Sequence, residues 1–395
     1  MAFAPLSGMD RPAIDGGRPL FPEGLPFVRP TVPDPRAVLH EVEDILSTGL
    51  LTNGPRVRML EERAADYLGV RHCIAVSSCT SGLMLVLRAA DLTGEVVLPS
   101  FTFAATAHAV AWNGLRPMFA DVDAETLTLS PTAAATRATA VRTSAILATH
   151  TFGTPADIDG LEELARAAGI RLFFDAAHAF GSRHASRPVG GFGDAEVFSL
   201  SPTKVLVAGE GGIIATNDDI LAERCRIGRD YANPGDYDCR FVGLNARMSE
   251  FHAAVALASL EGLEERIDHR NELARTYKEA LSDVPGLTFP SIKEGDRSTY
   301  KDFTILIDAD RFGLDAAGLG RALAAEGIET RRYYTPPVHE MRAYRTNSNH
   351  NGGLPVTDRV ASQVITLPLW GAMADQQGRR VGQAVSRLGE AFLPG

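Results

Sequence analysis

The strongest constraint on the fold is a regular alternation of short apolar runs with longer helix-like runs between residues 72 and 218. A strand that lies parallel to its neighbour needs a crossover connection, and this connection is usually a helix. The alternation therefore predicts an α/β protein with a mainly parallel sheet that helices cover on both faces. We expect seven strands, within residues 72–78, 95–100, 116–123, 144–153, 170–174, 195–201 and 211–218.

The segments on either side of this alternation complete the expected domain organisation. Residues 36–68 are helical in pattern, and their second helix has Pro55 near its first turn and Gly69 at its end, which are usual start and stop signals. One long helix is expected over residues 245–277. The expected divisions are a loose arm rich in Pro and Gly at 1–35, a large domain at 36–270, and a smaller α+β domain at 271–395.

Composition and charge narrow the functional classes. The net charge of -10 leaves no domain-wide basic surface, so we expect no nucleic-acid partner, although a local pocket could still hold a small anion. The four cysteines form no CxxC pair, and no apolar run is long enough to span a bilayer. The first residues lack the basic start and apolar stretch of a secretory signal. We therefore expect a reduced, cytoplasmic protein with no metal centre.

Polar and cationic residues gather where the expected strands end. In an open parallel sheet, ligands bind outside the carboxyl ends of the strands. These ends carry SSCTSG at 77–82, PSFTF at 99–103, THTFG at 149–153, DAAH at 175–178 and SLSPTK at 199–204. The topology should therefore bring these five segments to one edge of the sheet, where they could form a single cofactor site.

Taken one at a time, these residues also allow ordinary structural roles. The hydroxyl-rich segment 77–82 could hold a phosphate at the start of a helix, or could simply cap that helix. Asp175 could pair with a cationic ring nitrogen, bind a metal or cap a helix, and no metal-ligand spacing accompanies it. Lys204, which precedes the GEGG turn at 209–212, could be a solvated loop lysine or a lysine that forms a covalent bond inside a cleft.

Two further residues have the same ambiguity. Phe103 could stack on a cofactor ring or belong to the core, and Asn245 could donate to a phosphate or cap the long helix, for which Ser249 is a rival start. Together, however, a phosphate cradle, a stacking ring, a carboxylate and a lysine are what a pyridoxal phosphate enzyme needs, with an Asp that pairs with the pyridine nitrogen and a lysine that forms a Schiff base. The combination predicts such an enzyme.

The chain resembles the DegT/DnrJ/EryC1/StrS sugar aminotransferases, which have the aspartate-aminotransferase fold, also called PLP fold type I. The similarity extends over nearly the whole chain, from FVRPTVPD at residue 27 to TLPLW at residue 370. Its most specific segments are PSFTFAATAHAV, FFDAAHAFG, FSLSPTKVLVAGEGG and GLNARMSEFHAAVALASL, which occur in the order that the family shows.

This resemblance implies a role for each candidate residue. Lys204 would form the Schiff base with pyridoxal 5'-phosphate and then move protons, and Asp175 would pair with the pyridinium nitrogen. His178 would contact the side of the ring that carries the phenolic oxygen, and Phe103 would stack on the ring face. The resemblance assigns the phosphate to Cys79, Thr80, Ser81 and Ser199, and to Asn245 of a second subunit, so that the active unit would be a homodimer with a shared site.

Two positions depart from the usual family pattern. The phosphate segment usually reads Ser-Ser-Gly-Thr, and Cys79 replaces the glycine, which a contact through backbone N–H groups would tolerate at some steric cost. Ala246 stands where an aromatic residue is common, which would reshape the mouth of the substrate site.

The substrates are also implied by the resemblance. The amino donor would be L-glutamate, and the acceptor a nucleotide-linked keto-deoxysugar on the way to an antibiotic or a cell-surface glycan. The segment RPTVPD followed by LTNGP is most similar to members that aminate C4 of a dTDP-4-keto-6-deoxyhexose. Candidate cations for the nucleotide phosphates are Arg229, Arg331, Arg332 and His339.

Other functions remain open at this point. A C3 sugar aminotransferase and a cyclitol or keto-inositol aminotransferase would use the same residues. A pyridoxamine-phosphate-dependent sugar dehydratase of this fold typically has histidine in place of the lysine, so Lys204 argues against it. A catalytically silent regulator would have no need of Lys204, Asp175 and the phosphate cradle together.

Overall fold

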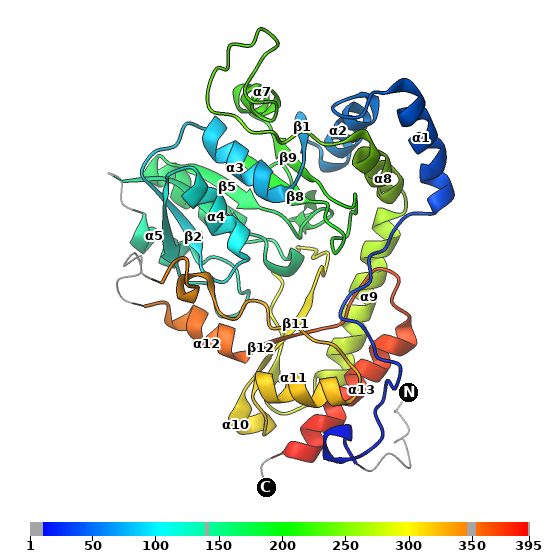
Figure 1. Ribbon diagram of the computed structural model, residues 1–395. Coiled ribbons are helices and arrows are strands. Elements are labelled where there is room, and N and C mark those ends of the chain that lie inside the picture. Colours follow the sequence, from blue (N-terminus) through cyan, green and yellow to red (C-terminus); the bar gives the residue numbers. More distant parts are fainter. Residues whose placement is uncertain (1–10, 139–141, 346–352, 394–395) are drawn as a thin grey trace.

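A seven-stranded sheet forms the centre of the large domain in the computed structural model, which describes residues 11–138, 142–345 and 353–393 (Figure 1). In spatial order its strands are β1 (His72–Val76), β9 (Gly212–Thr216), β8 (Ala195–Ser199), β5 (Arg171–Asp175), β4 (Thr143–Thr149), β2 (Glu95–Pro99) and β3 (Arg116–Ala120). All neighbouring pairs are parallel except those that β9 makes with β1 and β8. The predicted α/β fold with a mainly parallel sheet is confirmed.

The exception has a simple cause. Residues 200–211, between β8 and β9, contain no helix that could cross over the sheet, so the chain returns directly and β9 runs antiparallel. This return loop begins at the carboxyl end of β8, which is the same end as those of β5, β4 and β2. It therefore carries Lys204 to the edge of the sheet where ligands bind in such folds.

Helices cover both faces of this sheet, because its strands are almost entirely buried and apolar. One face packs against α3 (Cys79–Ala89), α4 (Ala104–Trp112) and α7 (Asp219–Gly228). The other face packs against α2 (Pro55–Leu68), α5 (Pro131–Arg137), α6 (Ile158–Ala168) and α8 (Glu250–Leu260). The short strands β6 (Arg183–His184) and β7 (Arg187–Pro188) and the 3-10 turn η2 (Thr151–Gly153) lie in the connections.

Helix α2 shows how distant residues complete a local start signal. It begins at Pro55 and is followed by Gly69 in the left-handed conformation, as predicted, but its N-cap residue, Gly54, has no side chain with which to cap it. The buried carboxylate of Glu250 accepts hydrogen bonds from the backbone N–H groups of Gly54, Arg56 and Val57 at 2.8 to 3.0 Å. The first turn of α2 is thus held by a side chain from the start of α8.

The long helix expected over residues 245–277 is two helices, so that prediction is wrong. Helix α8 begins after Ser249, whose side chain accepts the N–H of His252, and it ends at Leu260. Gly262 then adopts a φ of +65°, which favours glycine, before α9 (Leu263–Leu281) begins. Helix α9 leads from the large domain into the small one (Figure 1), and the boundary predicted at residue 270 falls inside it.

The small domain has its own antiparallel sheet and its own core. The sheet contains β10 (Leu287–Thr288), β11 (Phe303–Ile307) and β12 (Val364–Leu367). Its helices are α10 (Ala309–Phe312), α11 (Ala316–Ala325), α12 (Pro355–Gln363) and α13 (Asp375–Phe392), and η3 (Val338–Glu340) is a single 3-10 turn. Within the described residues, no helix is long and apolar enough to cross a membrane.

The N-terminal segment is a packed part of the small domain, so the expectation of a loose arm is wrong for its described residues. Leu20, Phe21 and Leu25 are buried in the small-domain core. Leu25 pairs with Ile328, and the carboxylate of Glu326 accepts the backbone N–H of Leu20 at 2.9 Å. From its short turn η1 (Ala13–Asp15), which contacts α11, the segment runs along the α9 side of the molecule to α1 (Pro35–Thr48) (Figure 1).

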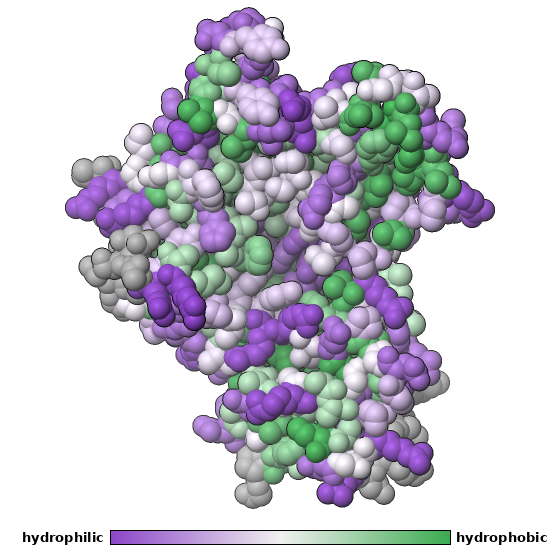
Figure 2. All heavy atoms as spheres, viewed as in Figure 1, coloured by the Kyte–Doolittle hydropathy of each residue, from purple (hydrophilic) through white to green (hydrophobic). Residues whose placement is uncertain are grey.

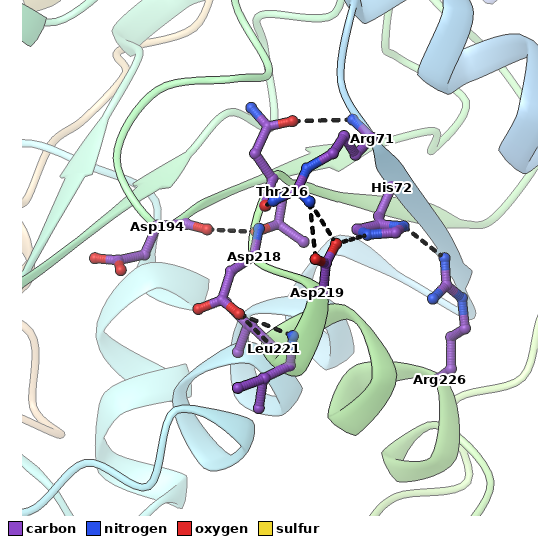
Figure 3. A network of polar contacts seen from close by, with 10 residues as sticks. Arg71, His72, Asp194, Thr216, Asp218, Asp219, Leu221 and Arg226 are labelled. Carbon is purple, nitrogen blue, oxygen red and sulfur yellow. Dashed lines mark hydrogen bonds and ion pairs between the residues drawn. The ribbon is translucent and has the colours of Figure 1, made fainter.

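A polar network fixes the end of the sheet that lies away from the ligand edge (Figure 3). His72, at the start of β1, lies 2.7 Å from Asp219 and 3.1 Å from Arg226, both on α7. Asp218 accepts the N–H groups of Ile220 and Leu221, and so caps the same helix. These contacts hold the start of β1 against α7, at the end of the sheet opposite to the carboxyl ends of the parallel strands.

Candidate active site

A cavity of about 340 Å³ lies at the carboxyl ends of the parallel strands, and all five strand-end segments reach it. From the large domain it is lined by Ser78, Cys79, Thr80, Thr102, Phe103, Ala105, Thr149, Asp175, Ala177, His178, Ser199, Ser201, Thr203, Lys204, Glu210 and Gly211. From the small domain it is lined by Lys301, Asp302, Tyr333 and Tyr334. The two domains therefore form one site.

The start of α3 forms a small-residue cradle at the cavity wall. Ser78 and Ser81 cap each other: the Ser78 hydroxyl accepts the N–H of Ser81, and the Ser81 hydroxyl accepts the N–H of Ser78. The first N–H groups of a helix have no acceptor within the helix, and the helix dipole makes this end positive. A Cβ atom at Gly212, on β9, would come within 2.7 Å of the Cys79 nitrogen, so glycine keeps the neighbouring strand close to the cradle.

Asp175 ends β5 and is 3% exposed. Its carboxylate accepts the Thr106 hydroxyl at 2.6 Å and the Ala177 N–H at 3.1 Å, and the Cys79 sulfur lies 3.9 Å away. Burial raises the pKa of Asp175, and the two hydrogen bonds oppose that rise. A buried carboxyl group of this kind becomes a strong partner for a cationic group placed in the cavity.

Lys204 reaches the same cavity from the return loop between β8 and β9. Its backbone N–H donates to the Ser201 carbonyl at 3.0 Å, which fixes the start of the turn. Burial is the main cause that lowers the pKa of Lys204 to about 8, and the positive charge of Lys301 lowers it further. The amine is therefore far more often neutral near physiological pH than that of an ordinary lysine, and a neutral amine is the form that can attack an aldehyde.

His178 and Phe103 complete the large-domain wall. Burial is the main cause that holds the pKa of His178 well below its usual range, and the charges of Lys204 and Lys301 act in the same direction. The ring is therefore neutral. Its buried Nδ1 atom has no hydrogen-bond partner among the described residues. Phe103 is 62% exposed, although it is a large apolar ring. An unsatisfied ring nitrogen, an open aromatic face, a buried carboxyl and a helix start fit a phosphorylated aromatic cofactor.

Several predicted residues lie outside the lining of this cavity. Ser81 faces Ser78 in the capping box, whereas Cys79, Thr80 and Ser199 do line the cavity. Asn245 is exposed, pairs with Asp230 in an isolated bridge, and is not among the residues that line the cavity of its own subunit.

The four predicted substrate cations also lie elsewhere, and each has a structural partner. Arg229 is buried in an ion pair with Glu61. Arg331 lies 3.7 Å from Glu329, and Arg332 donates to backbone carbonyls at the end of α12. His339 lies between Ser100, at 2.7 Å, and Asp358, at 3.1 Å. The side chains of His339, Glu340 and Asp358 form a group of possible metal ligands that the sequence spacing did not suggest.

Sequence reasoning missed the small-domain wall of the cavity. Tyr333 and Tyr334 follow directly after the predicted substrate residues Arg331 and Arg332. Lys301 and Asp302 precede the apolar strand β11. A charged pair that is buried at 5% and 3% exposure ahead of a buried strand is the unusual feature. The signal in the sequence is the charged dipeptide Lys301-Asp302 directly before FTILI, but no neighbouring residue indicates that the two side chains are buried.

Comparisons with known proteins agree with this geometry. The model of the DegT/DnrJ/EryC1/StrS aminotransferase family matches residues 35–386. The chain is 35% identical to the erythromycin biosynthesis sensory transduction protein EryC1 of Saccharopolyspora erythraea, over 82% of this chain and 88% of that protein. It is 33% identical to a UDP-N-acetyl-3-dehydro-alpha-D-glucosamine 3-aminotransferase of Acidithiobacillus ferrooxidans, over 89% and 93% of the two chains.

A solved structure extends the likeness to three dimensions. The structure of DesI in the presence of its TDP-sugar product superimposes with a TM-score of 0.90 at 39% identity, over 96% of each chain. The match includes both the large domain and the small one. The chain therefore belongs to the DegT/DnrJ/EryC1/StrS family and is a pyridoxal-phosphate-dependent sugar aminotransferase of PLP fold type I.

Proposed function

We propose that the protein transfers the amino group of L-glutamate to C4 of a nucleotide-linked keto-deoxysugar, such as a dTDP-4-keto-6-deoxyhexose. The observation that carries this proposal is the meeting of Lys204, Asp175 and the start of α3 in one cavity. Similarity to DesI, solved with its TDP-sugar product, supports a TDP-linked acceptor. The choice of C4 rests on the N-terminal segment RPTVPD and LTNGP.

The second candidate is amination at C3. It is favoured by the 33% identity to the 3-aminotransferase of Acidithiobacillus ferrooxidans. We place C4 first because the segments RPTVPD and LTNGP are most similar to members of the family that aminate C4.

The residues of the cavity have complementary roles in the proposed reaction. When bound, pyridoxal phosphate supplies an aldehyde that carries the amino group between substrates and a ring that takes up an electron pair. Lys204 would hold the cofactor covalently through Nζ, and the same nitrogen, once released, would take a proton from the substrate carbon and return one. The carboxylate of Asp175 would keep the ring nitrogen protonated. His178 would be neutral, and its Nδ1, which has no hydrogen-bond partner among the described residues, would be available to the cofactor.

In this proposal the start of α3 would hold the phosphate of the cofactor, through the backbone at Cys79 and Thr80 and the hydroxyl of Ser199. The buried sulfur of Cys79 points towards Asp175 and the Val197 carbonyl. The cysteine therefore fits where glycine is usual, because its side chain is directed away from the cradle. Phe103, which lines the cavity, would cover the ring face.

We further infer that the active unit is a homodimer. Helix α1 buries only Ile45 of its 14 residues, and Leu39 and Leu46 are 59% and 63% exposed on it. With Leu50, Leu51 and Met59, they give the hydrophobic patch over α1 and α2 in Figure 2. Such a patch is larger than isolated surface residues would give and suits a protein partner. A second copy seated there would have its exposed Asn245 available for the phosphate cradle of the first.

The function is tested by supplying both substrates. Purified protein with pyridoxal phosphate and L-glutamate is given, in separate reactions, dTDP-4-keto-6-deoxyglucose, the corresponding 3-keto isomer and a keto-inositol, and the aminated product is identified by NMR. Amination of the 4-keto sugar supports the proposal, and amination of only the 3-keto sugar supports the second candidate. Amination of a keto-inositol alone would move the protein to the cyclitol class. Absence of any glutamate-dependent change would indicate a catalytically silent relative.

A further inference from the structure

A buried ion pair from the small domain lies in the wall of the cavity. Lys301 Nζ lies 2.8 Å from Asp302 Oδ1, and the two side chains are 5% and 3% exposed. Both residues line the cavity that Lys204 and Asp175 also line. Burying two charges is costly even when they are paired. A pair in this position therefore calls for an explanation beyond stability.

The pair has hydrogen-bonding capacity that the described residues do not use. A lysine ammonium has three N–H donors, and Lys301 has one hydrogen-bond acceptor among the described residues, the carboxylate of Asp302. The ring of Tyr333 lies 5.8 Å from Nζ. The second oxygen of Asp302, Oδ2, is buried and has no hydrogen-bond partner in the described part of the chain. A buried polar atom without a partner is uncommon in native structures and often marks a ligand.

The charges around the cavity leave few ways to bind an anionic donor. The described residues that line it include two cations, Lys204 and Lys301, and three acids, Asp175, Glu210 and Asp302. In the proposed function Lys204 is committed to the cofactor. Glutamate brings carboxylates into a cavity with an excess of acids, so its binding requires a compensating cation. Lys301 is the remaining one in this set.

We propose that Lys301 binds a carboxylate of the amino donor, while Asp302 holds Lys301 in place and accepts a hydroxyl group of the acceptor sugar with Oδ2. The inference rests on the proposed function and names a site for both of its substrates. Lys301 donates its two unused N–H groups to the donor carboxylate. When a neutral sugar replaces the donor, Asp302 still neutralises Lys301, so no uncompensated charge remains in the cavity. One pair thus serves the carboxylate of the donor and the uncharged sugar ring of the acceptor.

The test uses variants of the holoenzyme that are matched in size. Lys301→Met alone leaves the buried carboxylate of Asp302 unpaired, which would destabilise the fold. The double variant Lys301→Met with Asp302→Asn removes both charges and avoids that problem. Lys301→Arg restores the cation, Asp302→Asn removes only the acid, and Lys293→Met is a control at an exposed lysine outside the cavity. Circular dichroism and a thermal melt establish that each variant is folded.

Two measurements are made on each protein. Calorimetry gives the dissociation constant of glutarate, which has the carboxylates of glutamate but no amino group to react. Rapid mixing gives the glutamate concentration that half-saturates the spectral change of the bound cofactor. A hydrogen bond to a charged group is worth about 1.5–3 kcal/mol, so the double variant should bind glutarate about 10- to 100-fold more weakly. Lys301→Arg should recover most of this loss, and Lys293→Met should match the wild type.

Asp302→Asn separates the two halves of the proposal. Its half-saturating concentration of keto sugar should rise about tenfold, because a buried acceptor is changed to an amide, while glutarate still binds. Equal glutarate affinities in wild type and double variant, including no binding in either, would overturn the assignment of Lys301. An unchanged response to the keto sugar in Asp302→Asn would overturn that of Asp302. If the wild type shows no spectral change with glutamate, the proposed function itself fails.

Discussion

The state of the Lys204 amine gives a quantitative prediction. Burial and the charge of Lys301 lower its pKa from 10.5 to about 8. A lysine is neutral above its pKa, so the reactive fraction rises with pH and is nearly complete above about pH 9. At pH 7.5 about a quarter of Lys204 should be neutral, against about one part in a thousand for an ordinary lysine, a difference of about 200-fold.

Competitive labelling of the cofactor-free protein measures this directly. The protein is treated with fluorodinitrobenzene across a pH series, and mass spectrometry follows the peptides that contain Lys204 and Lys293. Lys293 is an internal control, since the carboxylates of Asp157 and Asp159 raise its pKa although its slight burial acts the other way. Labelling of Lys204 should reach its midpoint near pH 8, well below that of Lys293. A midpoint equal to or above that of Lys293 would refute the conclusion that Lys204 is buried and has a lowered pKa.

Asp302→Asn and the single variant Lys301→Met, each shown to be folded by circular dichroism, should move the labelling midpoint of Lys204 in opposite directions. Lys301 lowers the pKa of Lys204, and Asp302 raises it. Lys301→Met should therefore shift the midpoint upwards, and Asp302→Asn should shift it downwards. Shifts of the same sign in both variants would show that a change of structure, not of charge, is responsible.

Three further substitutions have expected outcomes. Thr106→Val removes the hydroxyl group that donates a hydrogen bond to the Asp175 carboxylate at 2.6 Å. The cofactor should still bind, but the glutamate-dependent spectral change, followed by rapid mixing, should be about tenfold slower. An unchanged rate would contradict this prediction. Gly212→Ala places a Cβ atom within 2.7 Å of the Cys79 nitrogen at the start of α3, and such overpacking costs about 1–3 kcal/mol. The dissociation constant of the cofactor, measured by fluorescence titration, should therefore rise about tenfold. An unchanged dissociation constant would show that the cradle can shift to make room. Glu250→Gln disturbs three hydrogen bonds at the start of α2 and should lower the free energy of unfolding by about 2 kcal/mol in urea, and an unchanged midpoint would argue against this capping role.

The sequence predicts those parts of the site that one sheet edge organises. Asp175 ends an apolar run, and Lys204 follows another, so parallel topology alone brings them together. The hydroxyl-rich segment at 77–82 caps α3 and also lines the cavity. Its role as a helix cap therefore does not exclude the predicted contact with a phosphate.

The parts that depend on long-range packing could not be predicted. Arg229 looks like an available cation in the sequence, and only the fold shows Glu61, 168 residues away, beside it. Lys301 and Asp302 precede a strand and look solvated, yet the two-domain cavity buries them. The break at Gly262 was missed because helix-forming residues continue on both sides of a single glycine, which a periodic pattern tolerates.

The most direct test of the account is the visible spectrum of the purified protein with pyridoxal phosphate, before and after L-glutamate, beside Lys204→Ala. We predict a visible band from the cofactor joined to Lys204, loss of that band on addition of glutamate, and absence of the band in Lys204→Ala, where the lysine nitrogen is missing. A wild-type protein that shows no such band with saturating cofactor, or a Lys204→Ala variant with the same band, would contradict the central claim.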